Sequence, residues 1–307
     1  MANELTNTDY FTQLAVQRAP TLVKSLFIES DVFNPDTDWN FILGSSDQGV
    51  QYNRGRQGAK DAGRVILNHL ANMIKPISHA RKLCPHVVKQ EISQNLWSPH
   101  LVHLGSGHDH VYELLKLALG KGIKKFLIFN LDAHADMRPD DLLHSGTPFR
   151  YFFTKHQKDI KNYHLAQWGI HRYYQSESDL DLKGAEVEVL WSHEIDTQSI
   201  EQSIKKIKLL VEPYQKNETL VLVSLDADVL CGSNMPAVSA VNPRGFSVDF
   251  TSQIIKKIQQ EFQCFQTVLG VYEYNPLYDD ISARGAKTLA TIVYDWCLGR
   301  DMGVPFI

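Results

Sequence analysis

Three side chains that could bind a metal ion crowd into the five-residue segment DAHAD. Asp132, His134 and Asp136 occupy alternate positions there, directly after the apolar run KFLIFNL. In extended backbone, alternate side chains project to the same side, so the two carboxylates and the imidazole would converge. Carboxylates that close together raise each other's pKa unless a cation lies between them. The spacing therefore favours a metal site, although a solvated loop rich in Asp and His would show the same residues.

Two further segments place residues of the same kind after apolar runs. SLDAD contains Asp226 and Asp228 at the end of the run TLVLVSL, and GSGHD contains His108 just after HLVHL. In open sheets of parallel strands, ligands bind in the crevice beyond the carboxyl ends of the strands, where these segments would meet. Four carboxylates and two imidazoles exceed what one tetrahedral zinc needs and suit two ions that share carboxylates. Such an oxygen-rich set favours Mn²⁺, although zinc, cobalt or nickel could also bind it.

The elements that must position these residues alternate between strand and helix. Short apolar runs predict buried strands at 41–43, 100–104, 125–131, 164–170, 187–191, 219–225 and 267–273. Helical periodicity predicts helices at 109–119, 196–214, 247–262 and 286–298. Strand then helix, repeated, predicts an α/β protein with a parallel sheet covered on both faces. We expect a single domain over 1–307, in which about the first 40 residues form an N-terminal surface extension.

Composition argues against several classes of protein. Of the 307 residues, 43% are hydrophobic and 21% are charged, which supports a globular domain with a sizeable core. The formal net charge of -4, without a basic stripe, argues against a nucleic-acid partner. No apolar run approaches the roughly 18 residues of a membrane helix, and the start MANELTNTDYF lacks the features of a signal peptide. The four widely spaced cysteines are typical of reduced core thiols in a cytoplasmic protein.

The segments GSGHD, DAHAD and SLDAD together closely resemble the motifs of the arginase/ureohydrolase superfamily, and the resemblance runs from about residue 40 to the end of the chain. Members of that superfamily are binuclear manganese hydrolases that cleave C–N bonds of guanidines and amidines. The resemblance implies a three-layer α/β/α fold around an eight-stranded parallel sheet. Family members are commonly homo-oligomers, so a homo-oligomer is compatible with the sequence. Two ligand sets that share Asp132 and Asp226 as bridges are also implied: His108, Asp132, Asp136 and Asp226 for one ion, and Asp132, His134, Asp226 and Asp228 for the other.

Within the superfamily, four motifs resemble those of the formimidoylglutamases, which convert N-formimidoyl-L-glutamate to L-glutamate and formamide in histidine degradation. These motifs are NRGRQGAKDAGRVIL at 53–67, DAHADMR at 132–138, HSGTPFR at 144–150 and QWGIHRYY at 167–174. The resemblance implies a small anionic amidine as substrate. Guanidinium groups bind carboxylates bidentately, so we expect Arg138 to bind the substrate's carboxylates, together with Ser145 and Arg172. A surface or helix-packing role is expected for Arg56 and Arg150.

Two residues are expected to take part in the chemistry itself. Glu273 ends the predicted strand TVLGVYE, and the matching glutamate of the superfamily binds the cationic guanidine or amidine group. A local pair with an arginine is the alternative for this residue. The resemblance further implies that a hydroxide formed between the two ions attacks the amidine carbon. Asp136 is then expected to pass a proton to the leaving glutamate nitrogen.

The chain departs from the superfamily at positions that bear on the substrate. An arginase has a histidine shortly after its Ser-Gly pair, where this chain has Thr147 and Pro148, so arginine becomes a less favoured substrate. Ser106 interrupts the glycines of GSGHD and affects only the local turn. The first alternative is another ureohydrolase activity, as a guanidinobutyrase, agmatinase or arginase. The second is a non-catalytic metal-binding subunit for regulation or assembly. A metal-dependent deacetylase shares the fold type but fits the DAHAD cluster less well.

Overall fold

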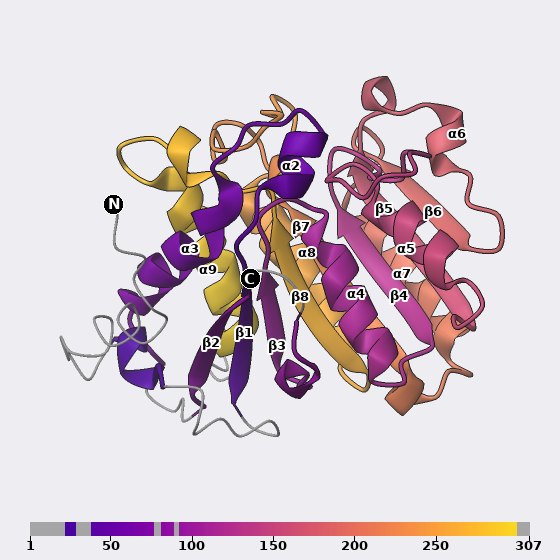
Figure 1. Ribbon diagram of the computed structural model, residues 1–307, viewed down its shortest axis with the longest axis horizontal. Helices are drawn as coiled ribbons and strands as arrows, with labels where there is room; N and C mark the ends of the chain where they lie inside the picture. Colours follow the sequence, from indigo (N-terminus) through magenta and orange to yellow (C-terminus); the bar gives the residue numbers. More distant parts are fainter. Residues whose placement is uncertain (1–21, 29–37, 77–80, 89–91, 300–307) are drawn as a thin grey trace.

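One parallel sheet organises the chain in the computed structural model, which describes residues 22–28, 38–76, 81–88 and 92–299 (Figure 1). Its eight strands run in the order β2-β1-β3-β8-β7-β4-β5-β6, and every neighbouring pair is parallel. The predicted parallel α/β fold is therefore confirmed. The strands are β1 (Trp39–Gly44), β2 (Leu83–Val88), β3 (Leu101–Leu104), β4 (Lys125–Leu131), β5 (Asn162–Ile170), β6 (Glu186–Trp191), β7 (Thr219–Asp226) and β8 (Gln266–Tyr272).

Helices cover both faces of this sheet and complete three layers (Figure 1). In β4, Leu127, Phe129 and Leu131 pack in the same core as α3, α7, α8 and α9, whereas Phe126 and Ile128 pack in the core of α4 and α5. Burial on both sides explains why central strands such as β4 are predominantly apolar. The α-helices are α2 (Gln48–Tyr52), α3 (Ala62–Ala71), α4 (His110–Gly120), α5 (Pro148–His156), α6 (Glu177–Leu180), α7 (Thr197–Val211), α8 (Val248–Glu261) and α9 (Arg284–Leu298). Short 3-10 helices are η1 (Val23–Leu26), η3 (Ala59–Asp61), η4 (Gln94–Leu96), η5 (Arg172–Tyr174), η6 (Lys216–Glu218), η7 (Ala227–Val229) and η8 (Pro276–Tyr278).

Several elements lie outside the strands and helices that the sequence predicts. β2 pairs only with β1 in the strand order, so it is an edge strand, and it contains Pro85. Proline is tolerated at a sheet edge because a missing N–H there breaks no ladder hydrogen bond, but it weakens the sequence pattern of a strand. Among the helices, α3 and α5 are also unpredicted. Pro148 occupies the first position of α5, where its missing N–H costs nothing.

The expected N-terminal surface extension lies largely outside the described residues. In the described segment 22–28, Val23 and Leu26 are buried and pack in the same core as α3. The backbone N–H of Val23 also donates to the carbonyl of Met73 at 2.9 Å. This short segment is therefore part of the core and does not extend over the surface.

Two expectations from composition concern the cysteines and the helices. The four cysteines are free, but only Cys84 and Cys297 are buried, whereas Cys231 is half-buried and Cys264 is exposed. The expectation of core thiols therefore holds for two of the four. In the part of the chain that the structure describes, we find no helix with the length and apolar character that crossing a membrane requires.

Candidate metal centre

The four central strands of the sheet bring the predicted metal-binding residues together. β3, β8, β7 and β4 are neighbours in the sheet, and all of them run in the same direction. His108 follows β3, Asp226 ends β7, and Asp132 directly follows β4. Because the carboxyl ends of parallel strands meet at one edge of a sheet, residues far apart in the sequence become neighbours there.

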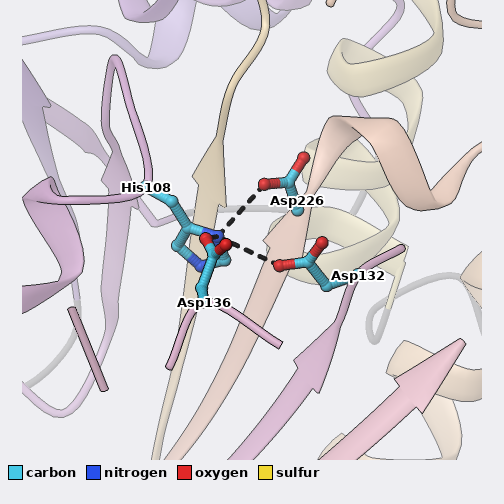
Figure 2. A group of neighbouring side chains, drawn as sticks. All are labelled: His108, Asp132, Asp136 and Asp226. Carbon is cyan, nitrogen blue, oxygen red and sulfur yellow. Dashed lines mark hydrogen bonds and ion pairs between the residues drawn. The ribbon is translucent and has the colours of Figure 1, made fainter. Parts of the chain in front are cut away.

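A first group of four residues surrounds the imidazole of His108. Its Nδ1 atom lies 3.3 Å from Oδ2 of Asp132, 2.9 Å from Oδ2 of Asp136 and 3.1 Å from Oδ2 of Asp226. Figure 2 shows these side chains pointing toward one another. One atom from each residue lies within 4.8 Å of the others, so a single cation could contact all four residues. Three of the four are buried, and Asp136 is half-buried.

A second group contains Asp132, His134 and Asp228. Nδ1 of His134 lies 3.0 Å from Oδ2 of Asp228 and 3.6 Å from Oδ1 of Asp132. Asp132 belongs to both groups, as expected of a bridging ligand. Asp226, which the resemblance also implies as a bridge, belongs only to the first group, and its Oδ1 accepts the backbone N–H of Asp228 at 2.8 Å.

Local hydrogen bonds fix these carboxylates in place. Oδ1 of Asp132 accepts a hydrogen bond from the backbone N–H of His134 at 2.7 Å. Its Oδ2 accepts one from Nδ2 of Asn130 at 3.1 Å. Oδ1 of Asp228 accepts the backbone N–H of Ala133 at 3.3 Å. Aspartates commonly bond to the backbone N–H two residues ahead, which turns the chain sharply at the strand end. The turn, and not a continued strand, therefore brings His134 beside Asp132.

Charge crowding shifts the pKa values of the cluster in opposite directions. Burial, reinforced by the neighbouring carboxylates, raises the pKa of Asp226 and of Asp136. Burial also acts on Asp132, but its hydrogen bonds to both imidazoles outweigh it and lower the pKa of this carboxyl. Against the effect of burial, hydrogen bonds to Asp132, Asp136 and Asp226 raise the pKa of His108 well above its usual value. The charge of Asp228, followed by the hydrogen bonds to Asp132 and Asp228, does the same for the pKa of His134. A divalent cation would offset this repulsion between buried carboxylates, so the cluster fits a metal ion.

Residues beyond the two groups orient His108. Its Nε2 lies 2.8 Å from the hydroxyl oxygen of Ser224, and its ring stacks on Tyr272 at 4.8 Å between centroids. A metal-ligating histidine usually bonds through its second ring nitrogen to a group that fixes the ring. Ser224 was not among the predicted site residues, although its position two residues before Asp226 puts both side chains on one face of β7.

Glu273 lies directly beside the cluster. It follows β8, is 8% exposed, and its Oε1 accepts the backbone N–H of His108 at 3.0 Å. Burial raises the pKa of Glu273 to about 8. Its backbone has a φ of 63°, a left-handed conformation that non-glycine residues rarely adopt. Asp136, with a φ of 51°, shares this conformation. Strained backbone at two residues that face the same cluster is typical of a functional site.

Two of the predicted substrate-binding residues meet at the same edge of the sheet. Arg138 is exposed, and its backbone N–H donates to the carbonyl of Gly146 at 3.0 Å. Ser145 is only 5% exposed. Asn53 contacts both residues. Its Oδ1 accepts a hydrogen bond from Nη2 of Arg138, and its Nδ2 donates one to the Ser145 hydroxyl oxygen at 2.8 Å. Asn53 was not among the predicted site residues, although it begins the NRGR motif.

The other predicted arginines have contacts outside the cluster. The guanidinium of Arg172 stacks on Trp191 at 4.4 Å and pairs with Glu194 at 3.3 Å. Arg150 donates to the backbone carbonyl of Met137 at 2.6 Å and to those of Ser178 and Asp181, both at 2.8 Å. Arg150 therefore has the expected packing role, whereas Arg172 is directed to residues that belong to neither metal-binding group.

Comparisons with known proteins agree with this geometry. The sequence profile of the arginase family matches residues 44–299. The formimidoylglutamase of Photorhabdus laumondii is 27% identical over 297 residues, which cover 87% of this chain and 89% of that protein. The crystal structure of the Bacillus subtilis formimidoylglutamase has a TM-score of 0.77 at 20% sequence identity, with 93% of both chains covered. The Trypanosoma cruzi formiminoglutamase, solved with Mn²⁺, has a TM-score of 0.70 at 20% identity and covers 92% of this chain and 98% of its own.

The family match spans most of the chain and contains all of the residues that form the two groups. The structural similarity to solved members independently supports the three-layer fold with its eight-stranded parallel sheet. This chain therefore belongs to the arginase family and is a metal-dependent hydrolase of the formimidoylglutamase-like type.

Proposed function

We propose that this hydrolase converts N-formimidoyl-L-glutamate to L-glutamate and formamide with two Mn²⁺ ions. The observation that carries the proposal is the combination at one sheet edge of two metal-binding groups with the exposed guanidinium of Arg138. The metal-binding groups suit hydrolysis of a C–N bond, and a guanidinium suits a substrate that carries carboxylates. This substrate belongs to histidine degradation, and we propose a cytoplasmic role in that pathway.

The donor set supports manganese. Carboxylate oxygens predominate over imidazole nitrogens, and no thiolate belongs to either of the two groups. We assign Asp132 as the bridge between the ions and retain Asp226 as the proposed second bridge. His108, Asp136 and Asp226 would complete the first site, and His134 and Asp228 the second. Other divalent ions could occupy the same ligands.

The proposed chemistry needs a group that binds the amidinium of the substrate, an activated water and a residue that transfers a proton. Bound at these residues, the ions would lower the pKa of water and stabilise negative charge that develops in the transition state. The carboxylate of Glu273 would bind the N–H groups of the amidinium and hold its carbon at the cluster, because the cationic amidinium beside it would lower the raised pKa of this carboxyl. Water adds to that carbon, the bond to the glutamate nitrogen breaks, and Asp136 passes a proton to this nitrogen. Asp136 belongs to the first metal-binding group and lies 2.9 Å from the imidazole of His108, so its carboxylate is placed at the cluster to take up a proton from water and pass it on.

At the other end of the substrate, Arg138 and Ser145 would bind carboxylate oxygens. Arg138 presents a planar fork of N–H donors that matches a carboxylate, and Ser145 offers a hydroxyl. We keep Arg172 in the proposal as a more distant candidate, because its stack on Trp191 and its pair with Glu194 would have to break before it could bind substrate.

The test is to incubate the Mn²⁺-loaded protein with N-formimidoyl-L-glutamate and, in parallel, with arginine, agmatine and 4-guanidinobutyrate. Glutamate and formamide from the first compound alone would support the proposal. Urea from any of the others would support a hydrolase activity but refute N-formimidoyl-L-glutamate as the substrate. Hydrolysis of none of them by protein with two bound ions would favour the non-catalytic alternative.

Matched variants connect the activity to the metal centre. Asp226→Asn should lower both bound manganese and turnover, because it replaces a charged ligand by a neutral one of the same shape. Asp249→Asn makes the same change at an exposed position in the first turn of α8 and should leave both unchanged. Wild-type turnover in Asp226→Asn would refute the proposed ligand set.

A further inference from the structure

The loop between α2 and η3 links parts of the site that come from different strands. From the β8 side, Nδ2 of the buried Asn275 donates to the backbone carbonyl of Arg56 at 2.7 Å and to that of Gln57 at 3.0 Å. From the β7 side, the hydroxyl of Ser239 accepts the backbone N–H of Arg56 at 3.0 Å. The loop is therefore anchored to the segments that follow β7 and β8, close in sequence to Glu273.

Asn53 begins this loop and reaches the segment that follows β4. Its Oδ1 accepts a hydrogen bond from Nη2 of Arg138, and its Nδ2 donates to the Ser145 hydroxyl oxygen at 2.8 Å. The carboxamide of Asn53 is half-buried, whereas Arg138 is exposed and Ser145 is buried. One short side chain therefore contacts both residues that we propose for carboxylate binding.

The orientation of the Asn53 amide follows from the chemistry of its partners. A guanidinium has five N–H donors and no acceptor, so the group facing Arg138 must be the amide oxygen. The amide nitrogen then faces Ser145, whose hydroxyl oxygen accepts its hydrogen. Because that oxygen is already an acceptor for Asn53, the hydroxyl hydrogen points elsewhere. The contact with Arg138 also uses only one of five guanidinium donors, which leaves the others for a carboxylate.

An arginine with an exposed side chain would otherwise sample many rotamers. Ordering such a side chain costs conformational entropy. A contact that already restrains it before substrate arrives reduces the cost of binding. The backbone bond from Arg138 to Gly146, at 3.0 Å, fixes only the start of the side chain, whereas the hydrogen bond to Asn53 restrains the guanidinium itself.

We propose that Asn53 is a positioning residue that sets the specificity for carboxylate-bearing amidines by holding Arg138 and Ser145 in their binding orientations. This inference rests on the proposed function and extends it to a residue outside the DAHAD and SGTPF motifs. Asn53 acts through its two partners and does not take part in the reaction at the amidine carbon. Its loss therefore affects substrates that carry carboxylates and spares amidines that lack them.

The experiment compares two substrates in the Mn²⁺-loaded protein: N-formimidoyl-L-glutamate and N-propylformamidine, which has the amidine but no carboxylate. Asn53→Ala should raise KM for the first about tenfold, the usual effect of losing one hydrogen bond to a charged group. Its kcat/KM for the second should stay within about twofold of wild type. Asn53→Asp has the same shape but pairs its own charge with Arg138, so we expect a larger rise in KM. Gln51→Glu adds the same charge at an exposed position of α2 and should behave as wild type.

A double-mutant cycle tests whether Asn53 acts through Arg138. In the Arg138→Ala background, adding Asn53→Ala should change KM for N-formimidoyl-L-glutamate by clearly less than it does alone, because the shared interaction is already gone. Equal losses on both substrates, or full additivity in the cycle, would show a general structural role and overturn the proposal. If Asn53→Ala does not fold, the isosteric Asn53→Asp decides: unchanged KM would overturn the proposal.

Binding of the product separates this inference from the proposed function. Calorimetry with L-glutamate needs no turnover, and Asn53→Ala should weaken glutamate binding about tenfold relative to wild type and to Gln51→Glu. A wild-type protein that binds glutamate through Asn53 but hydrolyses none of the amidines would refute the reaction and keep the positioning role. If wild type hydrolyses N-formimidoyl-L-glutamate and Asn53→Ala changes neither KM nor glutamate binding, the reaction is supported and the positioning role is refuted.

Discussion

Gly146→Ala is expected to impair substrate binding without destabilising the fold. A Cβ added at Gly146 would lie 2.2 Å from Nη2 and 2.6 Å from Cζ of Arg138, which is closer than atoms can pack. The atoms that must move belong to the far end of a long, exposed side chain. Gly146 is also absent from the glycines with left-handed backbone, so alanine brings no strain of its own. The guanidinium should therefore swing away while the backbone stays in place.

The size of the effect follows from the contact that is lost. A hydrogen bond to a charged group contributes about 1.5–3 kcal/mol, so kcat/KM for N-formimidoyl-L-glutamate should fall roughly 10- to 100-fold. The midpoint of thermal unfolding should stay within about 2 °C, since a change of 1 kcal/mol shifts it by about that much in a chain of this size.

Steady-state kinetics and a thermal melt measure both quantities, and Gly299→Ala is the control. Among the residues that the structure describes, its added Cβ would meet only Cβ of Asp295, at 3.9 Å. Unchanged kinetics in a folded Gly146→Ala variant would refute the role of Arg138. A large fall in the melting temperature would show that the backbone, and not the guanidinium, moves.

Three further predictions concern the metal and the core. Asp132→Asn removes the carboxylate that both groups share, so bound manganese should fall below one ion per chain. Turnover should fall by on the order of 10³-fold. Two bound ions per chain, measured by elemental analysis, would contradict the role of Asp132 as a bridge. Treatment with a chelator should abolish turnover and lower the melting temperature, and added Mn²⁺ should restore both, because metal binding stabilises the folded state. His103 is buried, and burial lowers its pKa to about 3, so between pH 6.5 and 3 the unfolded chain binds a proton that the folded chain does not. The free energy of unfolding should therefore decrease as the pH is lowered through that window, by about 2 kcal/mol at pH 5. In denaturant unfolding, the free energy of unfolding of His103→Gln should depend less on pH than that of wild type.

The sequence predicts the centre of the sheet better than its edges. β4 and β7 are buried on both faces, so they form predominantly apolar runs that end in the DAHAD and SLDAD segments. Their carboxyl ends must lie together in any parallel sheet that pairs them, and this makes the convergence of Asp132 and Asp226 predictable. The edge strand β2 lacks such a pattern, because half of its residues are only partly buried.

Side-chain direction in the loops could not be predicted in the same way. Arg172 belongs to a motif near the site, yet its guanidinium lies on Trp191, a residue of β6 that pairs with β5. Asn53 lies 85 positions from Arg138 and 92 from Ser145, and a small amide carries no pattern that would reveal this contact. Sequence spacing identifies residues at strand ends, but only tertiary packing decides which way a loop side chain points.

The strained backbone of the site gives an independent reason to assign chemistry to Asp136 and Glu273. Left-handed backbone costs a non-glycine residue about 1–3 kcal/mol and persists only where neighbouring contacts enforce it. His108 supplies such contacts to both residues: its imidazole lies 2.9 Å from Asp136, and its backbone N–H donates to Glu273 at 3.0 Å. Glu273 is further held by its own N–H, which donates to the carbonyl of Ser106 at 2.8 Å. The loop after β3 thus stabilises Asp136 and Glu273 in backbone conformations that are unfavourable for these residues on their own. Arg54 and Ala283, which belong to neither metal-binding group, share the left-handed backbone. It is therefore the coincidence of this backbone with the two residues chosen on chemical grounds that favours a catalytic site over a purely structural metal site.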